Sequence, residues 1–307
     1  MRLTTYFDGA NKRLGLAMGD YLFDLSLASR ALLSDSALED LLPPGHPLNM
    51  LALLQAGTEA WGIIQRVWDL VYQAGAAAPD FEFSRQLSKI QHAPLIENPG
   101  KIICIGLNYA DHCREQNFDI PTSMILFAKF PTAITGPNSP ITWPEEISQQ
   151  VDYEAELAVL IGRTARNVSE DEALDYVAGY TIANDVSARD VQFADQQWVR
   201  GKSFDTFCPL GPYLVTPDEI PDPHKLNIRC WVNGELRQDS NTDQMIFKVS
   251  EAIAFISKTC TLLPGDVICT GTPDGVGVFR KPPIFLKAGD LVEVEIEGLG
   301  RLSNPVA

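Results

Sequence analysis

The spacing of hydrophobic residues divides the chain into two parts with different secondary structure. Residues 2–7 and 13–18 are apolar runs on either side of a turn rich in Gly, Asn and Lys, and they predict a β-hairpin. Residues 50–73 carry leucine, tryptophan, isoleucine and valine at near-helical spacing, which predicts a helix. Further along the chain, short β-branched runs separated by Gly, Pro and Asp replace this pattern. We therefore predict a small N-terminal α+β domain over 1–95 and a second domain over 96–307.

The second part of the chain has the pattern of a mostly β domain. Strands are predicted over 101–106, 123–128, 156–162, 179–184, 213–216 and 226–232. Two later units, 263–268 and 287–292, each place a Gly-Asp turn before an apolar run. A capping-box pattern predicts a helix over 169–176, and helical spacing predicts another over 247–259. Together the two parts predict an α+β protein with more strand than helix.

The charge of the chain limits the partners that it can have. The 307 residues include 40 acidic and 24 basic side chains, which gives a formal net charge of −16. That field repels nucleic acids and anionic lipids, so we expect neither as a partner. There is no run of 18 apolar residues, and the first residues lack the apolar region of a secretion signal and carry Asp8. We therefore expect a cytoplasmic protein.

Three acidic residues are spaced two apart at the start of the segment 151–162. On a strand, alternate side chains share a face, so Asp152, Glu154 and Glu156 are predicted to point the same way. The segment continues into an apolar run that looks buried on both faces, and carboxylates at the end of such a strand need a cation or protons. An all-oxygen site selects a hard cation, Mg²⁺ or Mn²⁺. The alternative from the pattern alone is a solvated edge strand with three surface acids.

Four further segments carry candidate functional groups. Asp185 follows a predicted strand about thirty residues later, and it is either a third metal ligand or a helix cap. His112 and Glu115 lie three apart on a predicted helical turn, where the carboxylate orients the imidazole for general-base catalysis; a surface His–Glu pair is the alternative. Lys202 follows a glycine that lets a ligand approach, which makes it a candidate ligand-binding group. The alternative is a solvated surface charge. The Gly-rich loop 270–277 links strands, and its backbone amides can hold a carboxylate.

Taken together, these segments resemble the fumarylacetoacetate hydrolase family over about residues 98–306. The segments that carry the resemblance are Gly106-x-Asn-Tyr-Ala-Asp-His112-x-x-Glu115, Glu154-x-Glu156, Asn184-Asp-Val-Ser-Ala-Arg-Asp190, Gly201-Lys-Ser-Phe and Thr270-Gly-Thr-Pro-x-Gly-Val-Gly277, in the family's order. Within the family, segments 111–117, 202–211 and 275–283 are most similar to the domain-containing protein 2 branch. The resemblance implies a mixed β-sandwich roll for the C-terminal domain and a homodimer.

The resemblance also assigns roles to individual residues. The family's metal ligands are matched by Glu154, Glu156 and Asp185, and its catalytic dyad is matched by His112 and Glu115. Its substrate-binding positions are matched by Arg189, Gln192, Thr272 and Lys202, of which Lys202 is also counted as catalytic. Leu107 departs from the shorter acylpyruvase-like members, which have Arg there, so their substrate preference is not carried over.

The chemistry that the resemblance implies is that of a small 2-oxo acid reacting through a metal-bound enolate, with Mg²⁺ or Mn²⁺ as the cofactor. Hydrolysis of a C–C bond, as in acylpyruvates, is the family reaction. Keto–enol tautomerisation of oxaloacetate, which the domain-containing protein 2 branch favours, and decarboxylation are alternatives. A metal-binding relative without turnover is a further alternative. A Cys113 nucleophile paired with His112 is disfavoured, because neighbours on a helix point to different sides.

Overall fold

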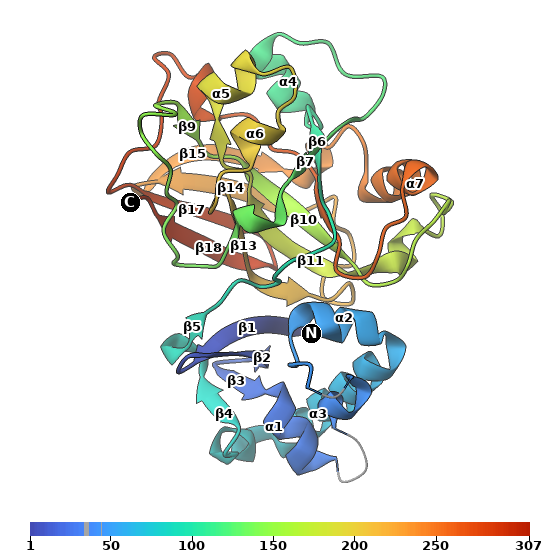
Figure 1. The fold of residues 1–307 in the computed structure, drawn as a ribbon. Helices are drawn as coiled ribbons and strands as arrows, with labels where there is room; N and C mark the ends of the chain where they lie inside the picture. The colour runs from blue at the N-terminus through green and yellow to red at the C-terminus, as the bar shows by residue number, and fades with distance from the viewer. Residues whose placement is uncertain (34–36, 44) are drawn as a thin grey trace.

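One large sheet runs through both parts of the chain. The computed structural model describes residues 1–33, 37–43 and 45–307, and within these residues the largest sheet has twelve strands. They are β1 (Arg2–Asp8), β2 (Asn11–Met18), β3 (Tyr21–Asp24), β4 (Ser84–Gln86), β5 (Gln91–His92), β6 (Ile102–Gly106), β7 (Ile125–Lys129), β8 (Ile134–Thr135), β10 (Ala155–Ile161), β11 (Val177–Asn184), β13 (Cys208–Val215) and β16 (Val267–Cys269). Their order is β4-β3-β2-β1-β13-β11-β10-β16-β6-β7, with β5 beside β1 and β8 beside β13. The N-terminal strands therefore occupy one end of the sheet (Figure 1).

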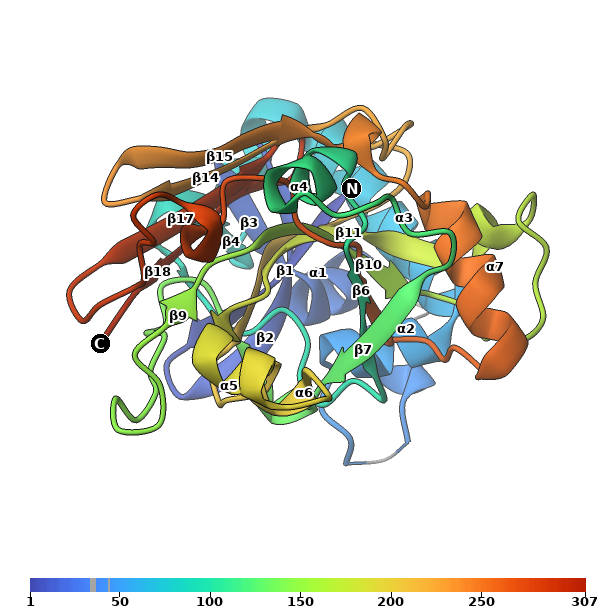
Figure 2. The same cartoon turned by 90° about the horizontal axis from the view of Figure 1, so that it is seen from above.

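Two smaller sheets complete the β structure of the described residues. A four-stranded sheet has the order β15-β14-β17-β18, and a two-stranded sheet pairs β12 with β9. Their bounds are β9 (Val151–Asp152), β12 (Ser187–Ala188), β14 (Asn227–Val232), β15 (Glu235–Asn241), β17 (Leu291–Ile296) and β18 (Gly300–Pro305). Seen from above, the four-stranded sheet lies along one side of β10 and β11 (Figure 2). The C-terminal part is thus the layered, mostly β structure that the sequence predicts.

Helices lie at both ends of the molecule. The α-helices are α1 (Leu25–Leu32), α2 (Met50–Ala56), α3 (Thr58–Ala74), α4 (Ala110–Gln116), α5 (Arg189–Ala194), α6 (Val199–Lys202) and α7 (Val249–Thr259). Short 3₁₀ helices occur at Leu38–Leu41, Gly75–Asp80, Leu87–Lys89, Pro131–Ala133, Ala173–Tyr176, Thr242–Gln244 and Gly277–Phe279. Among the residues that the structure describes, none of the helices combines the length and apolar character that a membrane crossing needs.

Two predictions for the helices need correction. The single helix predicted over 50–73 is two helices, α2 and α3, because Gly57 between them has a positive φ of 70° that continuous helix does not allow. The helix predicted over 169–176 is reduced to a 3₁₀ turn at Ala173–Tyr176. There the Ser169 hydroxyl donates to the Glu172 carboxylate at 2.7 Å instead of capping a helix.

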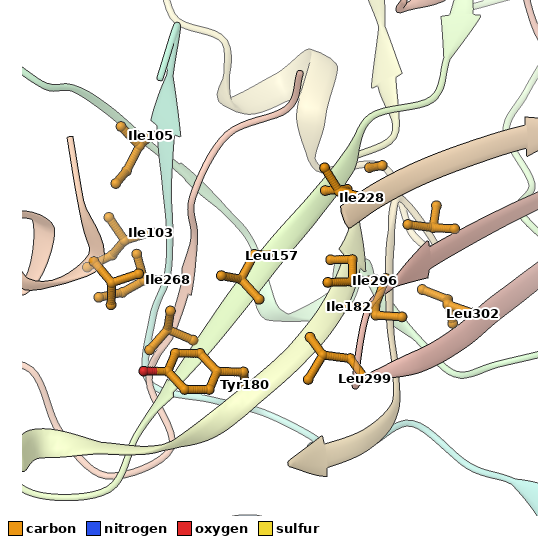
Figure 3. Close-up of a cluster of buried hydrophobic side chains, with 14 of the residues drawn as sticks. Ile103, Ile105, Leu157, Tyr180, Ile182, Ile228, Ile268, Ile296, Leu299 and Leu302 are labelled. Atoms are coloured by element: carbon orange, nitrogen blue, oxygen red, sulfur yellow. The ribbon is translucent and has the colours of Figure 1, made fainter. Parts of the chain in front are cut away.

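β10 separates two hydrophobic cores by the alternation of its side chains. Leu157, Val159 and Ile161 belong to the core shared with the four-stranded sheet, whereas Ala158 and Leu160 belong to the core shared with the N-terminal helices. Figure 3 shows the first core, where Leu157, Tyr180 and Ile182 lie among isoleucine and leucine side chains of β14, β17 and β18. A strand that is buried on both faces accounts for the nearly continuous apolar run in this segment.

The N-terminal part is joined to the rest of the chain by main-chain pairing. The predicted hairpin is confirmed as β1 and β2, and β3 extends it. β1 also pairs antiparallel with β13, where Arg2 faces Val215 and Leu3 faces Leu214. Because the sheet continues across residue 95 in this way, the division of the chain into two domains stays a prediction.

Candidate active site

Three carboxylates meet where β10 and β11 lie side by side. Glu154 lies in the gap between β9 and β10, Glu156 is the second residue of β10, and Asp185 directly follows β11. The antiparallel register, in which Ala155 faces Asn184, brings these positions together, and the Asp185 amide donates to the Glu154 carbonyl oxygen at 2.9 Å. One oxygen from each carboxylate lies within 4.8 Å of the others, and all three residues are buried.

Buried cations surround these carboxylates. Lys202 Nζ donates to Glu154 Oε2 at 2.8 Å and to Asp185 Oδ2 at 2.9 Å. Lys129 Nζ donates to Asp185 Oδ1 at 2.5 Å. Arg189 Nη1 lies 2.7 Å from Glu154 Oε1. Each cation is almost fully buried, so water competes little for these ion pairs. The ion pairs therefore hold the side chains of the site in fixed positions.

The two glutamates of the site differ in their electrostatic surroundings. Burial works to raise the pKa of Glu154, but the charges of Lys202 and Arg189 outweigh it and lower that pKa to about 2. The pKa of Glu156 is raised well above its ordinary value by burial and by the negative charges of Asp185 and Glu154. The amide of Gly271 donates to Glu156 Oε2 at 2.9 Å and partly offsets this effect.

The donor set fits a hard divalent cation. The group offers three carboxylate oxygens that lie within 4.8 Å of one another, with no sulfur or imidazole nitrogen among them. Such all-oxygen ligands are the ones that Mg²⁺ and Mn²⁺ prefer. Repulsion among the buried carboxylates also favours a bound positive charge. Glu154, Glu156 and Asp185 are therefore the residues that would hold such an ion.

A histidine and a glutamate face this site from α4. Both lie on one side of the helix, and His112 Nδ1 is 3.2 Å from Glu115 Oε2. The other oxygen of Glu115 accepts a hydrogen bond from the Gly275 amide at 3.0 Å. Glu115 thus fixes the imidazole by way of Nδ1, which leaves Nε2 as the nitrogen available to a ligand.

The loop of residues 270–278 connects several parts of the site through its backbone amides. Besides the bonds from Gly271 and Gly275, the amides of Gly277 and Val278 donate to Asp152 at 2.8 and 3.0 Å. Asp152 in turn accepts from Arg189 Nε at 2.9 Å. The sequence indicates that these amides can hold a carboxylate, and the carboxylates that they hold belong to the protein itself.

A cavity of about 260 Å³ connects these groups. Seven of the predicted site residues line it, namely His112, Glu154, Glu156, Arg189, Gln192, Lys202 and Thr272. The other two, Glu115 and Asp185, do not line it but contact residues that do. The Gln192 amide oxygen accepts from Arg189 at 3.1 Å, and the Thr272 hydroxyl accepts from Gln238 at 2.8 Å. The structure therefore brings all nine residues to one place, while their individual roles stay predictions.

Sequence reasoning missed two groups at this site. Lys129 ends the apolar strand β7, whose other residues are exposed or half-buried, and its charge at the end of an apolar run was the available signal. The second group is aromatic: Phe118, Phe127, Phe193, Trp198 and Phe279 line the cavity beside its charged residues. These residues come from five separate segments, so no local pattern marks them as neighbours.

Comparison with known proteins gives a consistent family assignment. The family model described as fumarylacetoacetate (FAA) hydrolase C-terminal matches residues 101–307. An oxaloacetate tautomerase from Xenopus laevis, named as mitochondrial, is 54% identical over 86% of this chain and 80% of its own length. A fumarylacetoacetate hydrolase domain-containing protein 2 homolog from Dictyostelium discoideum is 42% identical over 100% of this chain and 97% of its own.

Solved structures support the same assignment. A fumarylacetoacetate hydrolase from Exiguobacterium antarcticum has a TM-score of 0.76 at 35% identity and covers 100% of this chain and 99% of its own. Maleylpyruvate hydrolase from a Sphingobium species, solved with manganese(II) and pyruvate, has a TM-score of 0.75 at 30% identity with the same coverage.

The expected cytoplasmic location is wrong. The relatives from Xenopus laevis, Bos taurus and Homo sapiens are all named as mitochondrial proteins, which points to mitochondria instead. The expectation rested on the lack of a membrane-spanning apolar run and of a secretion signal. The lack of one targeting signal does not show in which compartment a protein resides, and composition and charge carry little information about the compartment.

Proposed function

This chain belongs to the fumarylacetoacetate hydrolase family, and from that premise we propose that it is a divalent-metal-dependent oxaloacetate keto–enol tautomerase. The observation that carries the proposal is the meeting of three buried carboxylates with the His112–Glu115 pair around one small cavity. The relatives that are 54–55% identical and are named oxaloacetate tautomerases support the choice of substrate. They favour tautomerisation over the C–C hydrolysis that is the family's reaction.

We propose that Glu154, Glu156 and Asp185 hold Mg²⁺ or Mn²⁺. When bound, the ion acts as a Lewis acid that polarises the 2-oxo acid and stabilises negative charge on its oxo oxygen. The manganese(II) ion in the maleylpyruvate hydrolase structure supports a divalent ion in this fold. Calorimetric titration with each ion should give binding that Glu154→Gln abolishes. Heat of binding that is unchanged in this variant would contradict the ligand assignment.

The chain's own residues supply the proton transfer and the charge. His112 Nε2 removes a proton from C3 of oxaloacetate, and the electron pair of that C–H bond becomes the C2–C3 double bond. Glu115 stabilises the imidazolium that forms, because its carboxylate lies 3.2 Å from Nδ1. The Lys202 ammonium, held at the carboxylates, places positive charge near the oxo oxygen as it becomes an enolate. Transfer of the proton from the His112 imidazolium to that oxygen completes the enol and restores the neutral imidazole.

The experiment that tests this function follows the enol and keto forms directly. Purified protein with Mg²⁺ is mixed with oxaloacetate, and the two forms are measured by proton NMR. We expect faster equilibration than in buffer with Mg²⁺ alone, and loss of this acceleration in Glu154→Gln. Equilibration at the rate of the metal-only control would exclude the tautomerase function.

Hydrolysis of acylpyruvates is the second candidate, since the maleylpyruvate hydrolase that shares the fold and 30% sequence identity is a hydrolase by name and was solved with pyruvate. The same dyad would then activate water, which attacks the distal carbonyl. The same NMR experiment with acetylpyruvate separates the two: release of pyruvate and acetate supports hydrolysis, and unchanged acetylpyruvate supports the tautomerase.

We also propose that the protein is a homodimer with its chain divided near residue 95. Large apolar side chains that are more than half exposed at Phe118, Ile120, Phe130 and Phe193 support association of two copies. The start of the family match at residue 101 supports the division. Light scattering coupled to gel filtration tests the first point, since a mass near 33.8 kDa would identify a monomer. Two separate calorimetric unfolding transitions would support the second.

A further inference from the structure

The cavity has a charged side and an aromatic side. Lys202, Arg189 and the two glutamates form the charged side, and five aromatic residues with Leu107 form much of the remainder. The charged side offers partners for the C1 carboxylate and the oxo group of a 2-oxo acid. The rest of the molecule, which in oxaloacetate ends in a second carboxylate, then extends toward the aromatic side.

Trp198 is held by contacts with α6 and with the end of β6. It directly precedes α6, and its carbonyl accepts a hydrogen bond from the Lys202 amide at 3.1 Å, so the two residues are one helical turn apart. Its ring lies against the end of β6: a Cβ atom placed on Gly106 would be 2.5 Å from Trp198 Cζ3. Only glycine at 106 leaves room for the indole in this position.

Phe127 connects the indole to the charged side. The Phe127 ring meets Trp198 edge-on, with centroids 5.3 Å apart and an angle of 67° between the rings. The ammonium of Lys202 lies 5.2 Å from the centroid of the same Phe127 ring. Trp198, Phe127 and Lys202 thus form one contiguous cluster of contacts. Packing within this cluster fixes the distance between the indole and the charged side of the cavity.

We infer that Trp198 is a specificity-determining residue that limits the length of the C3 substituent of the substrate. This inference rests on the proposed function, because it assumes that a 2-oxo acid binds at the charged side. The cavity of about 260 Å³ equals the volume of about nine liquid water molecules at ~30 Å³ each, which suits a short 2-oxo acid. A longer chain reaches the indole, which is in contact with the Gly106 backbone and with the edge of Phe127.

Binding of a homologous series tests the inference without any need for turnover. The Mg²⁺-loaded protein is titrated calorimetrically with pyruvate, 2-oxobutanoate, 2-oxopentanoate and 2-oxohexanoate. In the wild type, we expect 2-oxohexanoate to bind at least about tenfold more weakly than pyruvate, the cost of forcing its three extra methylenes against a fixed wall. In Trp198→Ala we expect the two acids to bind within about threefold of each other.

Two further variants keep the test decisive. Trp198→Phe removes part of the ring, keeps the core packed and should give an intermediate dependence on chain length. Trp231→Phe is the matched control: it lies on β14 under the Arg301 guanidinium, does not line the cavity, and should keep the wild-type profile. The same profile in wild type, Trp198→Phe and Trp198→Ala, with pyruvate still bound, overturns the inference alone. A wild-type protein that binds neither oxaloacetate nor any of the four acids instead overturns the proposed function and, with it, the premise of the inference.

Discussion

Two clusters of buried charge in this molecule are built on different principles. In the N-terminal part, Asp24 accepts hydrogen bonds from the Tyr6 hydroxyl at 2.5 Å, from Arg13 Nη2 at 2.9 Å and from the Leu27 amide at 2.8 Å. One buried carboxylate there meets one guanidinium, which also lies 4.0 Å from the half-exposed Asp8 carboxylate, and Asp24 caps α1. At the cavity, the described residues include four carboxylates, Asp152, Glu154, Glu156 and Asp185, which face three cations, Lys129, Arg189 and Lys202.

The difference separates a structural cluster from a functional one. The charges around Asp24 balance and its hydrogen-bonding capacity is used within the protein, so nothing further is needed for stability. The carboxylates at the cavity outnumber the cations, and burying an excess of like charge opposes folding. Such an arrangement persists in a protein when a ligand that is absent from the chain itself supplies the missing charge. Removing one carboxylate should therefore have opposite consequences in the two clusters.

The largest effect is expected when a carboxylate of the cavity is neutralised. Glu156→Gln should lower metal-dependent turnover at least about a thousandfold, because it removes a proposed metal ligand and part of the charge that would hold the ion. The same variant should be at least as stable as the wild type without metal, since it relieves repulsion. Steady-state kinetics and thermal unfolding without metal measure the two effects. Glu295→Gln, on the outer face of β17 where the side chain is 43% exposed, is the matched control, and full activity in Glu156→Gln would contradict the comparison.

The next effect concerns the dyad rather than the carboxylates. His112→Ala should reduce turnover at least about a hundredfold, because it removes the proton-transferring group. Metal affinity should stay within a few-fold of the wild type, because His112 is not part of the carboxylate group. Calorimetric titration with Mn²⁺ beside the kinetics measures both. If the variant loses the metal instead, His112 is a ligand and the division of labour proposed here is wrong.

A smaller effect in free energy is expected at the balanced cluster. Asp24→Ala should destabilise the protein by about 2 kcal/mol, since it leaves Arg13 and Tyr6 without their partner and uncaps α1. The estimate is below that for a fully buried pair, because the Arg13 side chain is 27% exposed. Turnover per folded molecule should not change. Chemical denaturation and kinetics at saturating substrate test the two parts, and a large loss of turnover would show that the clusters are coupled.

The smallest effect is a dependence of stability on pH. Burial works to raise the pKa of Asp24, but hydrogen bonds from Arg13, the Leu27 amide and Tyr6 outweigh it, so the pKa is lowered below its ordinary value. A carboxyl with a lowered pKa in the folded state stabilises the protein above its unfolded pKa of about 4 and loses this contribution as the pH falls through the folded value. The stability difference between wild type and Asp24→Asn should therefore shrink below about pH 4. A difference that stays constant down to pH 3 would contradict the assignment.

The sequence predicts those features of the cavity that depend on the spacing of neighbouring residues. Strand alternation places Val151, Tyr153, Ala155 and Leu157 on one face, and all four are found in one core, so this prediction is confirmed. The helix carrying His112 and Glu115 also lies where it was predicted. These features depend on residues that are close together in the chain, and local spacing therefore determines them.

The remaining features depend on pairing between distant segments. Lys129 reaches Asp185 across 56 residues, and β1 joins β13 across about two hundred, and neither contact leaves a periodic pattern. The break at Tyr153 and Glu154, which turns Asp152 toward Arg189, is also invisible in an uninterrupted strand pattern. Asp152 was grouped with the two glutamates by alternation, but its oxygens are taken up by Arg189 and the loop amides.

Three groups of the site depend on the single loop of residues 270–278. One short stretch of backbone touches the carboxylate Glu156, the dyad through Glu115, and the Arg189 anchor through Asp152. Since the contacts are made by peptide N–H groups, no side-chain replacement elsewhere can stand in for them. An insertion in this loop disturbs all three groups at once, whereas the residues on the aromatic side of the cavity can be replaced one at a time. Substrate preference can therefore diverge through single substitutions on the aromatic side, while a change in the loop removes all three contacts together.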